Sequence, residues 1–196
     1  MLKLDESKTE QKLRKEIAEL GKQLYDRGLV YATAGNISAR CGDCMLITPT
    51  GAMLGELTAD MIVKTDMDGN PTGRRKPSSE YRAHLEIYRR IPQHNAVIHT
   101  HPPASTAFAC LKKSIPTALL SEAALMLGNI GCAEYAKPGS DELARNILGF
   151  AYGNNVCLAE SHGLFAWGAN LRQAFYYTEL AEFTAKVCIN VNALGY

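Results

Sequence analysis

The sequence lacks long runs of one charge and long apolar runs. Its 196 residues include 21 Lys and Arg and 20 Asp and Glu, which gives a net charge of +1. This balance, without a basic stretch, does not indicate a nucleic-acid or anionic-membrane partner. No apolar run reaches the length of a membrane span, and the charged first twenty residues are unlike a secretory signal. We therefore expect a cytoplasmic protein.

Cysteine is sparse and irregularly spaced, with six residues in the chain. Such spacing is typical of free thiols in a reducing compartment rather than of a disulfide framework. Cys41 and Cys44 form one C-x-x-C pair, but a zinc site of this kind usually needs a second pair. Gly42 and Asp43 between them indicate the tip of a hairpin, so we interpret the pair as structural.

Internal repeats, low-complexity tracts and linkers are also absent, and the length suits a single domain over residues 1–196. Short runs broken by Gly, Asn and Pro predict strands within 33–51, 61–73, 96–101 and 155–168. Helical spacing and cap residues predict helices within 9–28, 77–92, 103–113, 121–128, 140–153 and 170–191. Hairpin-like spacings outnumber β-α-β spacings, which favours an α/β domain with a central, largely antiparallel sheet flanked by helices.

Histidine is scarce, with five residues, yet two of them stand one residue apart in "AVIHTHPPAS" (96–105). Side chains alternate between the faces of a strand, so His99 and His101 point the same way and could meet on one ion. His162 lies beside a glycine in a hairpin, and Glu80 lies at a helix start. Three imidazoles and a carboxylate would suit catalytic zinc or another divalent ion. His84 and His94 are competing ligands, which spacing alone does not exclude.

Three polar turns, "GNIS" (35–38), "TPTG" (48–51) and "PSSE" (77–80), form a second constellation. Their hydroxyl and amide side chains, with backbone N–H groups at two glycines and at a helix start beginning near Ser78, would suit a phosphate dianion. The alternative is that they are ordinary turn and cap residues. The residues concerned are Gly35, Asn36, Thr50, Gly51, Ser78 and Ser79.

The motifs "AGNISAR", "MLITPTG", "KPSSEYRAHLEIY", "NAVIHTHPPAS", "SIP", "YAKPGSDELA" and "HGLFAWG" run in this order from about residue 24 to residue 186. Together they resemble the class II aldolase/adducin family, and most closely its branch that acts on L-fuculose 1-phosphate. The resemblance implies that Glu80, His99, His101 and His162 bind zinc, or another divalent ion such as Mn²⁺ or Co²⁺. It also implies the family fold, a homotetramer with active sites at subunit interfaces, and a phosphate-binding role for the six turn residues named above.

The implied reaction is reversible cleavage of a ketose 1-phosphate to dihydroxyacetone phosphate and an aldehyde. The zinc ion would stabilise the enediolate, and Glu80 would be the acid/base. Leu120 stands where the fuculose-phosphate branch has a tyrosine. The C-terminal tail of that branch brings another tyrosine towards the site, a position for which Tyr196 is the candidate here. An apolar pocket would suit a deoxy or methylthio aldehyde. The alternatives are a sugar-phosphate dehydratase, decarboxylase or epimerase of the same superfamily, or a non-catalytic adducin-like interaction module.

Overall fold

The computed structural model describes the backbone of residues 2–195 and the side chains of residues 7–195. Seven strands form one sheet in the order β3-β2-β1-β4-β7-β6-β5, and every neighbouring pair is antiparallel except β5 and β6. This confirms the predicted α/β fold with a largely antiparallel sheet. The strands are β1 (Asn36–Cys41), β2 (Cys44–Ile47), β3 (Val63–Asp66), β4 (Ala96–Thr100), β5 (Cys132–Ala133), β6 (Val156–Ala159) and β7 (Gly163–Gly168).

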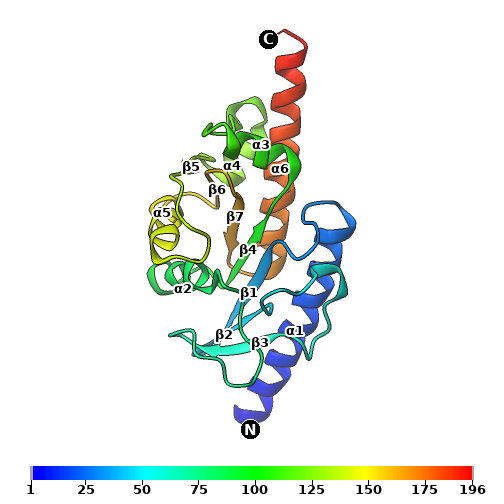
Figure 1. Ribbon diagram of the computed structural model, residues 1–196, viewed down its shortest axis with the longest axis vertical. Coiled ribbons are helices and arrows are strands. Elements are labelled where there is room, and N and C mark those ends of the chain that lie inside the picture. The colour runs from blue at the N-terminus through cyan, green and yellow to red at the C-terminus, as the bar shows by residue number, and fades with distance from the viewer. Residues whose placement is uncertain (1, 196) are drawn as a thin grey trace.

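Helices cover both faces of the sheet (Figure 1). The helices α2 and α5 pack on one face, whereas α1, α3, α4 and α6 pack on the other. The chain ends lie at opposite ends of the long axis of the molecule. The helices are α1 (Leu2–Asp26), α2 (Tyr81–Arg90), α3 (Pro103–Cys110), α4 (Ser121–Leu127), α5 (Asp141–Ala151) and α6 (Leu171–Ala193), with short 3₁₀ turns at Leu54–Glu56 and Thr117–Leu119.

The first helix follows its amphipathic pattern. Ile17, Leu20 and Leu24 are fully buried, while Leu13 packs at the edge of the same cluster. Their spacing places them on one side of the helix, which lies against β1 and β2. The chain leaves the helix through Gly28 at φ +68°, the left-handed conformation in which glycine commonly ends helices.

The Cys41–Cys44 segment is the hairpin tip that the sequence predicts. The two residues are direct partners across β1 and β2, and Gly42 adopts φ +60° between them. Both cysteines are free and half-buried. The positive φ explains why a glycine stands at the first turn position.

The structure differs from the sequence-based expectation at the end of β4, at the start of α2 and in the strand β5. The strand β4 ends at Thr100 rather than residue 101, and the two prolines that follow lack the N–H groups needed to continue a ladder. The helix α2 begins at Tyr81 rather than near Ser78, because the Ser78 N–H donates to Thr48 O (3.0 Å) in an extended bridge. The two-residue strand β5 is too short for its sequence pattern to be recognised.

The last helix is capped reciprocally. The Asn170 side chain accepts from Gln173 N (2.9 Å), and the Gln173 side chain accepts from Ala169 N (2.7 Å). The helix then runs to Ala193, two residues beyond the predicted end. Among the described residues, no helix combines the length and apolar character required to cross a membrane.

Candidate active site

The strand β4 lies at the centre of the sheet, between β1 and β7, and carries the histidine pair at its end. His99 is fully buried within the strand, and His101 follows one residue after the strand and is partly exposed. Their Nε2 atoms are 2.9 Å apart. The alternation of strand side chains therefore brings the two imidazoles together as the sequence predicts.

His162 reaches the pair from the turn between β6 and β7. Its neighbour Gly163 lies so close to β4 that a Cβ there would sit 2.4 Å from Thr100 O and 2.7 Å from His101 Cδ2. The glycine thus permits the turn to pack against the end of β4. The ligating nitrogens of His99, His101 and His162 all lie within 4.8 Å of one another.

Two contacts fix the ring of His99. Its Nδ1 lies 2.9 Å from Leu164 O, and a carbonyl oxygen only accepts, so Nδ1 carries a proton and donates it. Phe165, the direct partner of His99 on β7, stacks on the imidazole at a centroid distance of 4.1 Å. With Nδ1 engaged, His99 directs Nε2 into the centre of the cluster, as metal-binding histidines usually do.

Glu80 completes the cluster from the residue just before α2. Its carboxylate is buried (6% exposed), with Oε2 3.0 Å from His99 Nε2 and Oε1 3.4 Å from His162 Nε2. Asn36 donates from Nδ2 to Glu80 Oε2 (3.0 Å). Five side chains, from β1, the residue before α2, the end of β4 and the β6–β7 turn, thus meet, although these four segments lie far apart in the sequence.

The protonation of these groups favours a cation. Burial, and after it the charge of His99, lowers the pKa of His101 to about 3 and of His162 to about 4, so both offer lone pairs at neutral pH. Burial alone would raise the pKa of the Glu80 carboxyl, but His99, His162 and Asn36 lower it well below its usual range. Deprotonated imidazoles and a carboxylate are the forms that bind metal.

The donor set therefore fits a divalent metal ion. His99 Nε2 lies between Glu80 Oε2 and His101 Nε2 at about hydrogen-bond distance from each, so a proton or a cation must separate these electron pairs. Glu80 Oε1 is buried and has no hydrogen-bond partner among the described residues. A cation would satisfy these atoms together.

The competing histidines lie elsewhere. His84, one helical turn after Glu80, is fully buried, and its Nδ1 is 2.7 Å from Ser38 Oγ. His94 lies in the loop before β4. Neither belongs to the group of converging ligand atoms, a distinction that required the packing of α2 on the sheet.

The polar turns converge beside Glu80. Pro49 and Pro77 pair in an isolated bridge, which aligns the "TPTG" and "PSSE" turns, and Ser78 Oγ accepts from Glu80 N (3.3 Å). The Ser78 N–H group is not free as expected, since it donates to Thr48 O, and the Thr50 N–H group donates to Lys76 O. Within residues 2–195, the N–H groups of Gly51 and Ser79 have no such partner.

A cavity of about 700 Å³ borders the Ser78–Ser79 turn. Lys76 and Lys137 line it and bring positive charge that the sequence analysis did not assign to this site. Lys137 arrives through a close contact, because a Cβ at Gly139 would lie 2.6 Å from Ser79 O. No local sequence signal links Lys137 to these serines, which are nearly sixty positions away.

Sequence reasoning also missed two residues at His101. Glu182 of α6 is buried and accepts from Ala104 N (3.1 Å) and Ser105 N (2.8 Å) at the start of α3, just after His101. A lone acid on an apolar helix face was the available signal. Tyr31 packs edge-on against His101, with ring centroids 6.0 Å apart. Tyr196, considered above, lies outside the described residues.

Comparison with known proteins adds independent findings. The model of the Class II Aldolase and Adducin N-terminal domain matches residues 15–189. The chain is 40% identical over 174 residues to the 5-methylthioribulose-1-phosphate/5-deoxyribulose-1-phosphate aldolase of Rhodospirillum rubrum, covering 87% of this chain and 79% of that protein. It is 36% identical to the L-fuculose phosphate aldolase of Methanocaldococcus jannaschii, covering 90% and 95%. A solved L-fuculose 1-phosphate aldolase superposes with a TM-score of 0.89 at 34% identity, covering 94% and 88%.

Proposed function

The chain belongs to the class II aldolase and adducin family, and we propose that it reversibly cleaves a ketose 1-phosphate to dihydroxyacetone phosphate and an aldehyde. It is an enzyme of the class II aldolase superfamily, and a sugar phosphate fits this family as substrate. The observation that carries the finer proposal is the meeting of Glu80 with three histidines beside the polar turns 48–51 and 77–80. The ketose is L-fuculose 1-phosphate or a related deoxy or methylthio sugar phosphate.

His99, His101, His162 and Glu80 would hold the metal ion, which we propose to be zinc, with Mn²⁺ or Co²⁺ as alternatives. The bound ion would supply Lewis acidity at the substrate oxygens next to the bond that breaks. The three imidazoles would provide nitrogen ligands, and the Leu164 carbonyl and Phe165 ring keep that of His99 in place.

Glu80 is the proposed acid/base. Its carboxylate is ionised at neutral pH, is held by Asn36 and is buried from bulk water. In the condensation direction this carboxylate would accept the proton that C3 of dihydroxyacetone phosphate loses, and in the cleavage direction the protonated carboxyl group would return a proton to that carbon. Burial keeps competing water away from this transfer.

The proposed phosphate site consists of Asn36, Ser78 and Ser79 with Thr50, Gly51 and Gly35. The positive φ values of Gly35 (+82°) and Gly51 (+73°) are consistent with tight turns that expose backbone N–H groups. Lys76 and Lys137 add long-range attraction for a dianion. Anchoring the phosphate would hold the reacting carbons next to Glu80.

We also propose a cytoplasmic homotetramer with active sites at subunit interfaces, on the basis of family membership. Light scattering at micromolar concentration would measure a mass four times 21.4 kDa. A monomer mass together with full activity would contradict the tetramer, because the site would then be complete in one subunit.

A panel of ketose 1-phosphates tests the reaction. The expected result is release of dihydroxyacetone phosphate from substrates with a deoxy or methylthio end. Loss of water or of carbon dioxide without cleavage would assign the enzyme to the dehydratases or decarboxylases of the same superfamily. A protein with neither cleavage nor metal would be an interaction module.

Elemental analysis tests the metal. Protein purified without chelator should hold about one ion per chain. The variants His99→Ala and His101→Ala should lose the ion, whereas His94→Ala, outside the cluster, should retain it. Full metal content in both cluster variants would refute the proposed site.

A further inference from the structure

The loop 29–35 is tied to the histidine cluster at both ends. His101 N donates to Leu29 O (3.1 Å). At the other end, Gly35 adopts φ +82°, and a Cβ there would lie 2.9 Å from His99 O. The loop therefore follows the backbone of both histidines closely, and its middle residues must lie near the cluster.

Tyr31 stands in the middle of this loop. Its ring meets His101 edge-on, with an interplanar angle of 67°, and 63% of the residue is exposed. The next residue, Ala32, adopts φ +46°, a left-handed conformation that is strained for a non-glycine residue. Strained backbone and an exposed aromatic ring beside a catalytic cluster both indicate a functional role.

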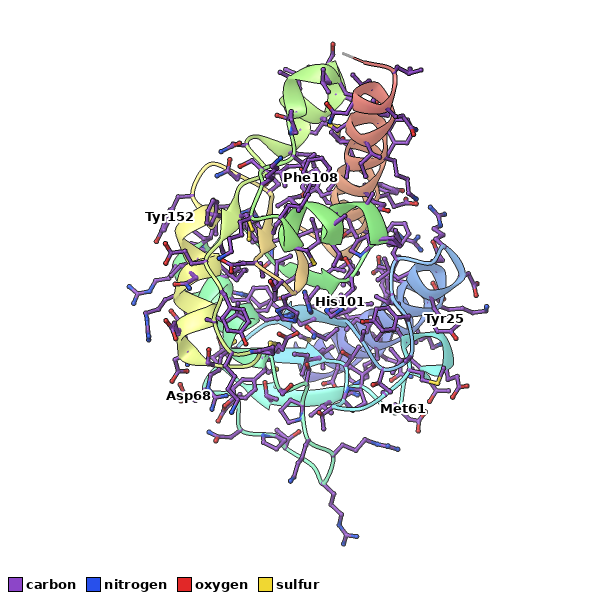
Figure 2. The ribbon with its side chains drawn as sticks, turned by 45° about the horizontal axis from the view of Figure 1, so that its top comes forward. Tyr25, Met61, Asp68, His101, Phe108 and Tyr152 are labelled. Atoms are coloured by element: carbon purple, nitrogen blue, oxygen red, sulfur yellow. The ribbon has the colours of Figure 1, made fainter. Side chains whose placement is uncertain are left out.

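The cluster is accessible on the side of His101, which Tyr31 contacts, and of His162. His99 is fully buried and Glu80 is 6% exposed, whereas His101 and His162 are partly exposed. A ligand that reaches the cluster from solvent therefore passes over His101 or His162, and the Tyr31 ring packs against His101. In the view of Figure 2, His101 lies near the centre, whereas Tyr152 lies at the outer edge.

We propose that Tyr31 determines specificity by contacting the part of the substrate that becomes the aldehyde, and that its ring favours an apolar substituent there. The proposed phosphate donors Asn36 and Ser78 both contact Glu80, whereas Tyr31 contacts His101. The electron-rich face of a phenol ring repels a dianion and packs well against methyl or methylthio groups. This inference rests on the proposed function, because it assigns one half of that substrate.

Condensation of dihydroxyacetone phosphate with paired aldehydes tests the assignment. Lactaldehyde and glyceraldehyde differ in a methyl against a hydroxymethyl end. Tyr31→Ala should lower the ratio of their kcat/KM values about tenfold, the usual worth of one apolar contact. Tyr31→Phe should keep the ratio, because it keeps the ring. Tyr152→Ala is the matched control, since Tyr152 is 61% exposed at the end of α5.

Proton exchange into dihydroxyacetone phosphate in heavy water needs no aldehyde. It therefore distinguishes failure of the role proposed for Tyr31 from failure of the proposed function. Exchange should continue unchanged in Tyr31→Ala, which also shows that the variant is folded. An unchanged aldehyde ratio in an exchanging Tyr31→Ala enzyme would overturn the role of Tyr31 alone. If Tyr31→Phe lowered the kcat/KM ratio of the two aldehydes as much as Tyr31→Ala does, the role assigned to the ring would be wrong. A wild-type enzyme with neither exchange nor condensation would overturn this inference together with the proposed function.

Discussion

The two faces of strands β1 and β4 carry opposite kinds of side chain, although both faces are buried. Ile37 and Ile98 point toward α1 and α6 and pack in an apolar cluster with Phe175. Asn36 and His99, each one residue away from these isoleucines, point to the other face and are direct partners in the β1–β4 pairing. This pair of strands thus carries Ile37 and Ile98 on one face and, on the other, the polar pair Asn36 and His99. We call this second face, which α2 covers, the chemical face.

The energetic difference follows from the atoms involved. Burying apolar surface stabilises the fold by about 25 cal/mol per Å². On the other face, Asn36 Oδ1, Glu80 Oε1 and His84 Nε2 are buried without a hydrogen-bond partner among the described residues. Each such atom costs about 1–3 kcal/mol. Both faces therefore stabilise the fold through apolar clusters, but only the α2/α5 face combines its cluster with buried polar groups that are available for binding and proton transfer.

The largest expected effect lies on the chemical face. Glu80→Gln keeps the size of the side chain but removes the proton acceptor, so turnover should fall by about 10²–10⁴. Cleavage kinetics and proton exchange into dihydroxyacetone phosphate measure the loss, and elemental analysis should still find metal. Undiminished exchange in the Gln variant would assign the base to another residue.

Ile98→Ala makes the converse change, one position before His99. Removing this buried side chain leaves a cavity, and the free energy of unfolding should fall by about 2–5 kcal/mol. Urea denaturation measures the change, and turnover per folded molecule should remain near the wild-type value. If Ile98→Ala instead kept its stability and strongly reduced turnover, the two faces would not differ in the way proposed.

Acidic pH should lower the free energy of unfolding through His84, which lies on the chemical face. Burial lowers its pKa to about 3 in the folded state, against 6.5 when unfolded. Between these values the unfolded chain binds a proton that the folded chain does not, so stability falls as pH decreases, by up to about 1.4 kcal/mol per pH unit.

The comparison protein for this measurement is His84→Asn, which keeps a polar group near Ser38 but does not titrate. Unfolding of both proteins in chelator, from pH 7 to pH 4, removes the contribution of metal. The difference between the two curves measures the contribution of His84. Parallel curves would mean that the pKa of His84 is the same in the folded and unfolded states.

The smallest effect should come from Ser38→Ala. The hydroxyl contacts His84 Nδ1 (2.7 Å) and Tyr88 Oη (2.6 Å), both buried, and its loss should cost about 1–3 kcal/mol of stability. Thr178→Val in α6 is the control, because Thr178 donates only to Ala174 O within its own helix. A greater loss of unfolding free energy in Thr178→Val than in Ser38→Ala would contradict the prediction that the buried hydroxyl of the chemical face contributes more to stability.

The sequence by itself determined most of the elements and the family. The spacing of Leu13, Ile17, Leu20 and Leu24 defined a helix, the Cys-Gly-Asp-Cys segment defined a hairpin tip, and Asn170 with Gln173 defined the start of α6. These features are local, because side-chain periodicity and caps act over a few residues. The motifs in their order identified the class II aldolase and adducin family, which the family model confirms.

Only the tertiary structure decided which polar residues meet. The sequence left His84 and His94 as candidates beside His162, and the packing of α2 directs His84 to Ser38 instead. It did not reveal the stacking of Phe165 on His99, the Tyr31 contact or the approach of Lys137 to Ser79. The physical reason is that these contacts depend on strand register and on glycine-permitted approaches between distant segments. A one-residue shift in register would place His99 on the apolar face, and no local pattern specifies that register.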